Sequence, residues 1–515
     1  MNVRPGASAI LLPLLLLSAG ILFGQNRTDS PVFKQYRPPD EIPLLRQSDP
    51  VYQIWQAFIC ARKANAGDPL AQHELGLRHL AGAGVERDTV KAAYWIQKAA
   101  AQNLVPARFN YAILAYNGWG TPWNPFEAYR NFLYCAEHDV TEAQFAVGIS
   151  FVEGLVHQED WEKGWSWVKK AADGGYKPAQ AALPMFEQNR AASKSTGNAD
   201  SLDAPVTPVT PTSFLADAGM DSLSVIQEKT LLKNALLQAD PQLRRALGLS
   251  RMMDSTSAVD SLDLEGIRRS ADAGSPEALA LLGRFSQQGL LARRDSVASA
   301  SFYLRAYRSD SRRAGKLLWE MAQTASFLGA MKARAEAGDS VAQFVWAGLT
   351  TLGMDAALLL AKAYITEQQA LQLLRKGAGT GYIPAMLELA LCYYGGRWVP
   401  ADGERAHAIL RDAASLGSQE AEIRLAALEI RTSTDTTRQK ELVGVLGRGQ
   451  QEGSLLAEVA LAYCAETGRG LPASAATAAR LYRSAWGRGS QDAYRALRRL
   501  HDAQRPPDPA FSVQD

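Results

Sequence analysis

The sequence predicts an all-α protein, a right-handed α/α superhelical solenoid of helical hairpins about 36 residues long, in two blocks joined by a linker. A turn residue recurs four positions ahead of an alanine, most of these pairs are 36 residues apart, and apolar residues between them follow helical spacing. Gly, Asn and Asp most readily adopt the left-handed backbone that ends a helix. Each pair therefore indicates that one helix stops and the next begins. The pairs are Gly67/Ala71, Asn103/Ala107, Asp139/Ala143, Gly175/Ala179, Gly274/Ala278, Asp310/Ala314, Gly338/Ala342, Gly381/Ala385, Gly417/Ala421, Gly453/Ala457 and Gly489/Ala493.

The first helix of each predicted hairpin starts near the alanine. Four residues later comes a large residue, usually followed by a small one, as in Leu75–Gly76 and Val147–Gly148. This pairing allows neighbouring helices to approach closely. Eleven residues after the alanine, a glycine is expected to close the helix at Gly82, Gly118, Gly154, Gly289, Gly353, Gly396 and Gly468.

The second helix of each hairpin carries alanines and aromatic residues at helical spacing. In the first block, Ala92, Trp95 and Ala99 are an example, with Phe132 and Trp167 in later hairpins. Offsets of three, four and seven residues place such side chains on one face of a helix. We expect this face to be buried.

This pattern resembles the Sel-one-like repeat, a branch of the tetratricopeptide superfamily. The segment AGDPLAQHELGLRHLAGAGVERDTVKAAYWIQKAAAQN, residues 66–103, matches the family pattern most fully, and later hairpins are more degenerate. The likeness covers about 51–188 and 262–500. It implies a solenoid that serves mainly as a protein-binding scaffold, and it does not identify the partner.

The spacing divides the chain into Sel-one-like repeat blocks at 51–188 and 262–503. Between them, residues 189–215 include the run APVTPVTPT and predict a disordered Pro/Thr/Ser-rich linker, followed by a helical cap at 216–261. Residues 504–515 are expected to be a disordered tail. Within the second block, a step of 28 residues from Ala314 is followed by one of 43 from Ala342, so one link should be shortened and the next lengthened.

The amino terminus predicts export. Residues 7–23 carry no charge and follow Arg4, and small residues lie where cleavage would occur, after Gly24 or Gly20. This pattern is typical of a signal peptide over 1–24. An uncleaved membrane anchor is the alternative, at the short limit of spanning length. The predicted location is the periplasm or cell envelope, or the exterior, with inner-membrane attachment only if the segment stays uncleaved.

Composition gives no reason to expect nucleic acid as a partner, because the formal net charge is only +2 in 515 residues. No histidine forms an H-E-x-x-H pair, and no P-loop or nucleophile elbow is present. We therefore predict no catalytic residue, no cofactor and no metal. Cys60, Cys135, Cys392 and Cys464 are spaced so that equivalent positions lie about two repeats apart, too far for a disulfide.

Aromatic residues near the hairpin ends are the candidate partner-binding residues. These are Tyr116, Trp119, Trp123, Trp161 and Trp398, together with the neighbouring polar residue Asn117. In loops they could present an exposed patch to a peptide or a glycan. Large apolar side chains also fold back over hairpin ends, so the sequence leaves both placements open.

Three functions follow from these observations. The favoured one is an exported, non-enzymatic scaffold that holds one or more proteins in the bacterial cell envelope, with glycan or peptidoglycan as further candidate partners. The second is a membrane-anchored regulator of an envelope complex. The third is a cell-wall-associated enzyme with its site in a cleft between the blocks.

Overall fold

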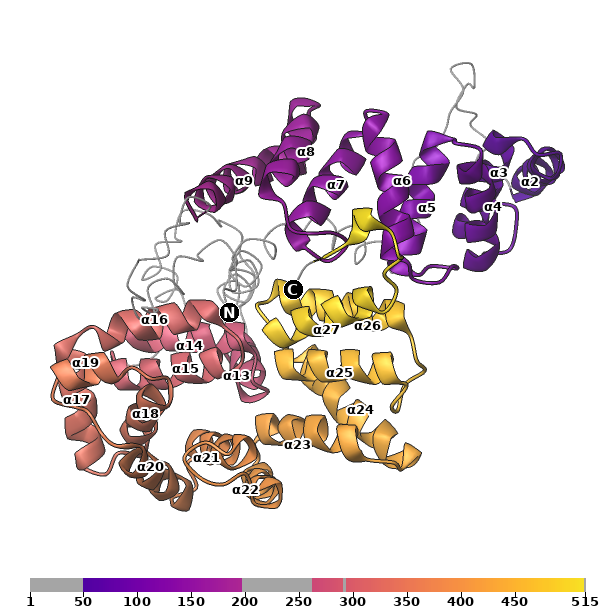
Figure 1. Ribbon diagram of the computed structural model, residues 1–515. Coiled ribbons are helices and arrows are strands. Elements are labelled where there is room, and N and C mark those ends of the chain that lie inside the picture. Colours follow the sequence, from indigo (N-terminus) through magenta and orange to yellow (C-terminus); the bar gives the residue numbers. More distant parts are fainter. Residues whose placement is uncertain (1–49, 197–261, 290–292, 514–515) are drawn as a thin grey trace, which may run out of the picture. The chain divides into compact units, whose positions relative to one another are not determined.

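The computed structural model describes residues 50–196, 262–289 and 293–513, and these contain 23 α-helices and no strand (Figure 1). The all-α prediction is therefore confirmed for this part of the chain. The predicted signal peptide at 1–24, the cap at 216–261 and most of the predicted linker lie outside the described residues. Residues 189–196, which we assigned to the linker, continue helix α9.

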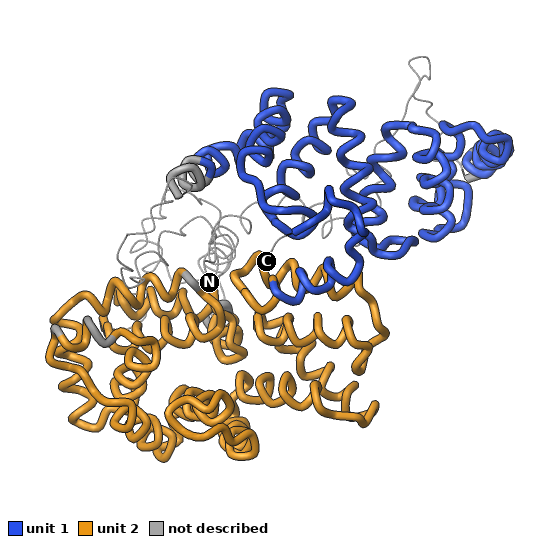
Figure 2. Tube along the Cα trace, viewed as in Figure 1, with its two compact units in different colours: residues 1–210, 495–515 blue, residues 211–494 orange. Residues whose placement is uncertain are grey.

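The chain divides into two compact units, which Figure 2 shows in different colours. Unit 1 comprises residues 1–210 together with 495–515, and unit 2 comprises residues 211–494. The carboxyl-terminal segment therefore belongs to the same unit as the amino-terminal hairpins.

Unit 1 consists of antiparallel helices in which each helix packs mainly on the next. They are α2 (Pro50–Asn65), α3 (Pro69–Ala81), α4 (Thr89–Ala101), α5 (Val105–Asn117), α6 (Pro125–Glu137), α7 (Thr141–Glu153), α8 (Trp161–Asp173) and α9 (Lys177–Thr196). Helices α3, α5 and α7 are first helices of hairpins, and α4, α6 and α8 are their second helices. Helix α2 occupies the place of a second helix at the start of the series.

Local sequence explains where these helices begin and end. Asp68 and Asp88 cap α3 and α4 by accepting hydrogen bonds from backbone N–H groups of the first turn. All eleven predicted turn residues have positive φ, including the non-glycine residues Asn103, Asp139 and Asp310. The predicted closing glycines end α3, α5 and α7 in the left-handed conformation. The helical punctuation predicted from the sequence is thus confirmed.

Close helix packing depends on the small residues of the repeat. A Cβ atom placed on Gly148 of α7 would lie 2.6 Å from a methyl carbon of Val168 on α8. Ala99, Ala107 and Ala128 are fully buried between neighbouring helices. The hairpins therefore stack through alanine and glycine contacts, with larger residues filling the spaces between them.

Unit 2 contains hairpins of the same kind. Its helices are α13 (Leu262–Asp272), α14 (Pro276–Gln288), α15 (Ser296–Arg308), α16 (Arg312–Ala322), α17 (Ala325–Glu336), α18 (Ser340–Thr351), α19 (Asp355–Leu360), α20 (Glu367–Gly379), α21 (Ile383–Gly395), α22 (Gly403–Ser415), α23 (Gln419–Thr432), α24 (Thr436–Gln451), α25 (Leu455–Thr467) and α26 (Ala475–Gly487). Its largest core cluster extends from α13 to α22.

The irregular spacing in unit 2 has a local structural cause. Only Gln323 and Thr324 separate α16 from α17. After α18, the additional short helix α19 lengthens the connection to α20. The predicted short and long links are both present.

The carboxyl-terminal residues differ from the expectation. Helix α27 (Gln491–Asp502) is followed by the 3-10 helix η2 (Pro509–Phe511), in the region that we predicted to be a disordered tail. The Phe511 side chain is buried in unit 1. The tail has few apolar residues, so its composition alone did not indicate that one of them would find a partner far away in sequence.

Candidate protein-interaction surfaces

Two of the predicted binding residues are part of the core of unit 1. The Trp123 side chain is 5% exposed, and its ring lies edge-on to His501 at 5.1 Å between centroids. Trp161 opens α8 and packs against Phe186 at 5.6 Å, while its indole N–H donates to Glu159 at 2.5 Å. Both indoles therefore fold back over hairpin ends, which is the second of the two placements that the sequence left open.

The other predicted binding residues are half-buried and do not form one patch. The Asn117 amide donates to the Ile113 carbonyl at 2.9 Å. Tyr116 and Trp119 pack against buried clusters of unit 1. Trp398 lies in unit 2, where it packs against the main core cluster beneath Arg397.

A different surface of unit 1 carries exposed apolar side chains. On α2 and α4, Ile54 is 59% exposed, Phe58 62%, Val90 65% and Tyr94 49%. Ile54 and Val90 occupy the same repeat position, 36 residues apart, and so do Phe58 and Tyr94. We call these four residues the outer strip. Exposed apolar groups that gather on one surface mark interaction sites in soluble proteins.

The outer strip lies on helices, whereas the candidate binding residues predicted from the sequence lie in or beside loops. The sequence feature that could have predicted the outer strip is the recurrence of large apolar residues at the repeat interval of 36 residues. Such a residue recurs at Ile54, Val90 and Phe126, at one repeat position of the second helices.

The third residue of that series, Phe126 on α6, is buried in a cluster with Phe511 of the carboxyl-terminal segment. Figure 1 shows that segment, in yellow, beside α6. The Phe511 ring lies edge-on to Phe126 at 5.2 Å and to Tyr129 at 5.9 Å. Val156, in the link between α7 and α8, completes the buried cluster. The Arg130 guanidinium lies 5.0 Å from the Phe511 ring centroid, within range of a cation–π interaction.

Polar contacts hold the same segment. The Arg505 guanidinium donates to the carbonyls of Leu155 and Val156 at 2.9 and 2.8 Å. Arg130 forms an ion pair with Asp508 at 3.0 Å. A hydrogen bond from the Ala510 backbone, with a smaller contribution from Arg130, lowers the pKa of the Asp508 carboxyl.

The carboxyl-terminal segment packs against the α7–α8 link, where the sequence differs from that of the two preceding links. In the α3/α4, α5/α6 and α25/α26 hairpins the corresponding residue is a glycine (Gly84, Gly120 and Gly470) that lies close to the backbone of the preceding second helix. At Gly84 and Gly120, a Cβ would lie 2.1 and 1.9 Å from the carbonyl oxygens of Gln53 and Thr89. The equivalent residue in the α7–α8 link is Val156, which has a side chain and cannot make that approach. Arg505 and Phe511 fill the resulting space.

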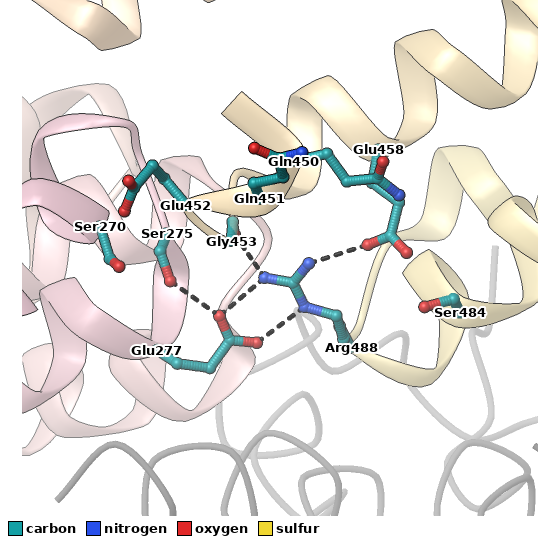
Figure 3. Close-up of a pocket in the computed structure, with 10 residues that line it drawn as sticks. All are labelled: Ser270, Ser275, Glu277, Gln450, Gln451, Glu452, Gly453, Glu458, Ser484 and Arg488. Atoms are coloured by element: carbon teal, nitrogen blue, oxygen red, sulfur yellow. Dashed lines mark hydrogen bonds and ion pairs between the residues drawn. The ribbon is translucent and has the colours of Figure 1, made fainter. Parts of the chain in front are cut away.

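Unit 2 contains a polar pocket of about 520 Å³ around a buried arginine (Figure 3). Arg488 donates to Glu277 at 2.8 and 3.0 Å, to Glu458 at 2.8 Å and to the Gly453 carbonyl at 2.6 Å. Although burial alone lowers the pKa of the Arg488 guanidinium, the two carboxylates raise it overall. The guanidinium is thus engaged by the protein itself, which leaves it poorly placed to bind an anionic ligand.

Ion pairs also join other distant hairpins of unit 2. Arg305 on α15 pairs with Glu420 on α23 at 3.0 Å. Arg308 on α15 pairs with Glu388 on α21. With Arg488 and Glu277, these contacts link the first hairpin of unit 2 to its fourth, fifth and sixth.

Two buried histidines of unit 1 stay neutral near neutral pH. Burial lowers the pKa of His73 to about 4, and its Nε2 atom lies 2.7 Å from the Asn110 amide. Burial also lowers the pKa of His157 to about 4. Among the described residues, no group of three or more His, Cys, Asp or Glu side chains is arranged to hold a metal ion. All four cysteines are buried and carry thiols.

Within the described ranges, no helix combines the length and apolar character needed to cross a membrane.

Comparison with known proteins identifies the repeat. The family model of the Sel1 repeat matches residues 69–104, 105–139, 141–176, 276–311, 383–418 and 455–485. These matches coincide with hairpins α3/α4, α5/α6, α7/α8, α14/α15, α21/α22 and α25/α26. The hairpins α16/α17, α18/α20 and α23/α24 complete unit 2 outside the matched residues.

Solved structures of similar proteins also have this repeat. A protective antigen present in uropathogenic Escherichia coli strains, described as displaying an SLR fold, shares 21% identity, with a TM-score of 0.30 over 86% of this chain and 81% of that chain. A Sel1 repeat protein from Oxalobacter formigenes shares 17% identity, with a TM-score of 0.21 over 71% of this chain and 97% of that chain. No curated protein matches the sequence.

Proposed function

This chain is a Sel1-repeat protein, and from that premise we propose that it is an exported, non-enzymatic scaffold that holds a partner protein in the bacterial cell envelope. Sel1 repeats generally mediate protein–protein interactions, so a protein-binding repeat scaffold is the general function. The envelope location and the lack of catalysis are the specific parts of the proposal.

The outer strip is the observation that carries this proposal. Ile54, Phe58, Val90 and Tyr94 expose large apolar side chains at matching positions of two consecutive second helices. Burying such side chains against a partner is favourable in proportion to the apolar area removed from water. Aromatic side chains are also enriched among the residues that dominate binding energy.

The uncharged amino-terminal segment supports export, and the engagement of Arg488 by Glu277 and Glu458 supports a structural role for the pocket in unit 2. Amino-terminal sequencing of the chain from its native host tests the first point. A mature chain that starts at Gln25 or Ile21 supports an exported scaffold. Retention of residues 1–24 in a membrane fraction would instead favour the anchored regulator.

Site-specific photo-crosslinking in the native host tests the binding surface. A photoreactive phenylalanine derivative replaces Tyr94, and the matched control replaces Tyr394, which is 51% exposed on α21 of unit 2. We expect one discrete adduct from position 94 and none at that mass from position 394. The Ile54→Ser/Phe58→Ser variant should lose the adduct while its melting temperature stays unchanged. Identical adducts from both positions would contradict the assignment of the outer strip.

A further inference from the structure

The carboxyl-terminal segment occupies the repeat position that follows the outer strip. Phe126 continues the series of Ile54 and Val90, and Arg130 continues the series of Phe58 and Tyr94. Ile54, Phe58, Val90 and Tyr94 are exposed, whereas Phe126 is buried in a cluster with Phe511. On this surface of the second helices, Phe511 therefore covers the position of Phe126, whereas the equivalent positions of Ile54 and Val90 remain exposed.

We propose that the surface formed by Phe126, Tyr129, Arg130, Val156 and Arg505 is a peptide-docking site for partner segments that carry an acidic residue three positions before a phenylalanine. The chain's own Asp508–Phe511 segment is its resident occupant and competes with the partner. This inference rests on the proposed scaffold function and names the chemistry of the segment that the scaffold recognises.

The phenylalanine requirement follows from the shape of the site. The Phe511 side chain is 2% exposed and contacts two aromatic rings edge-on, at 5.2 and 5.9 Å. Val156 and the Arg130 guanidinium border the same ring. An aliphatic side chain at this position would lose the edge-to-face contacts, and a small one would leave a void.

The acidic requirement follows from the position of Asp508. Its carboxylate accepts a hydrogen bond from the Ala510 backbone at 3.0 Å and pairs with Arg130 at 3.0 Å. The first contact holds the segment in a 3-10 turn, and the second sets the turn on α6. Because both partners of the ion pair are partly exposed, the pair contributes mainly register and selectivity.

Arg505 belongs to the docking site. Asp502 on α27 holds its guanidinium at 2.6 Å, and the carbonyls of Leu155 and Val156 hold it from the opposite side. These contacts do not involve the resident segment. The same guanidinium then donates to the Phe511 carbonyl at 2.6 Å. A partner segment with phenylalanine at this place would present the same backbone carbonyl.

The resident segment is suited to exchange. It is only four residues long, and the Phe511 ring is its buried anchor. The resident segment has one advantage over a partner segment, which is that it is covalently attached to the docking site's own chain. A tethered ligand acts at an effective concentration in the millimolar range. A partner that also covers Val90 and Tyr94 would make additional contacts and could displace it.

Peptide binding to the full-length chain tests the inference. The probe is a fluorescein-labelled peptide of residues 506–515, PPDPAFSVQD, and binding is followed by fluorescence anisotropy. We expect the Phe511→Ala chain, whose site is vacated, to bind the probe at least about tenfold more tightly than the wild-type chain, in which the tether supplies a competing ligand. A probe with alanine in place of its phenylalanine should not bind.

A charge exchange tests the role of Arg130. The Phe511→Ala/Arg130→Glu chain should bind the original probe at least about fivefold more weakly than Phe511→Ala, and a probe with lysine in place of the aspartate that corresponds to Asp508 should recover the loss. Circular dichroism establishes that each variant keeps its helical content. Recovery by the lysine probe is not expected if Arg130 acts only in folding.

Several outcomes would overturn the inference. One is that the probe fails to bind the Phe511→Ala chain at millimolar concentration, and another is that the alanine probe binds equally well. A wild-type dimer that dissociates on Phe511→Ala substitution would identify a second copy of this chain as the occupant instead. Loss of peptide binding alongside a retained adduct at position 94 would reject this site and leave the scaffold function standing.

Discussion

At the scale of single residues, Trp123 illustrates how a loop residue becomes part of the core. Its ring is buried against His501, which lies more than 350 residues later in the chain and in the same unit. A side chain with such a partner contributes to stability whether or not a binding partner is present.

Replacing Trp123 with alanine should lower the free energy of unfolding of unit 1 by about 3–5 kcal/mol, because the substitution removes a buried aromatic ring and leaves a cavity. Chemical denaturation followed by circular dichroism measures the change. The control is Tyr394→Ala, which removes an exposed ring and should change stability by less than about 0.5 kcal/mol. Equal effects of the two substitutions would contradict the burial of Trp123.

The histidines of unit 1 predict a pH dependence of stability. The pKa values of His73 and His157 in the folded protein, about 4, lie below the ordinary value of 6.5, so the unfolded chain binds more protons between these limits. Stability should therefore be complete above about pH 6.5 and fall as the pH drops to about 4, by up to about 3 kcal/mol per histidine.

Denaturation curves between pH 4 and pH 7 measure this loss. The His73→Gln variant keeps a hydrogen-bonding group near Asn110 but cannot titrate, so its stability should depend less steeply on pH than that of the wild type. The same slope in both proteins would show that His73 is not buried in its neutral form.

At the scale of elements, three links between paired helices also pack on the preceding second helix, through Gly84, Gly120 and Gly470. The Gly120 backbone approaches the amino-terminal turn of α4 so closely that a Cβ would lie 1.9 Å from the Thr89 carbonyl oxygen. The links therefore connect consecutive hairpins as well as the two helices within one. The α7–α8 link has Val156 in place of this glycine, and it accommodates the carboxyl-terminal segment.

The Gly120→Ala substitution should destabilise unit 1 by about 2–4 kcal/mol, because it adds overlap with Thr89 to the strain of a positive φ. Gly353→Ala is the matched control. Gly353 also has positive φ, but nothing lies within 4 Å of its added Cβ, so only the strain of about 1–2 kcal/mol is expected. Thermal unfolding of the two variants separates the terms, and equal losses would argue against the close approach.

At the scale of the whole molecule, unit 2 is held together by contacts between hairpins far apart in sequence. Arg488 joins Glu277 of the first hairpin to Glu458 of the sixth, and all three side chains are buried. A simple solenoid contacts only its nearest neighbours. Unit 2 should therefore unfold more cooperatively than a repeat array without such closing contacts.

Arg488→Met should destabilise unit 2 by about 3–5 kcal/mol, because it leaves two buried carboxylates without a partner. Hydrogen exchange of α14 and α25 should show the loss of protection. Arg438→Met provides the control, since that arginine forms exposed ion pairs and should change stability by no more than about 1 kcal/mol. A further Glu277→Gln/Glu458→Gln substitution should recover part of the loss by removing the stranded charges.

The repeat marks explain why so much of the local fold could be predicted. A left-handed turn at Asp139, a closing glycine at Gly154 and the short link after α16 each depend on residues within one hairpin. The division into two blocks stays a prediction, because the segment between them lies outside the described residues. The candidate site could not be predicted in the same way. The burial of Trp123 and the covering of Phe126 depend on partners near the carboxyl terminus.

The amino-acid order alone thus settled the helical hairpins and their repeat length, because turns, caps and helix faces depend on residues a few positions apart. The tertiary structure decided which apolar groups remain exposed, which one the chain covers with its own Phe511, and how Arg488 closes unit 2. These outcomes depend on contacts across hundreds of residues. Such contacts carry no periodic signal, since each is formed only once.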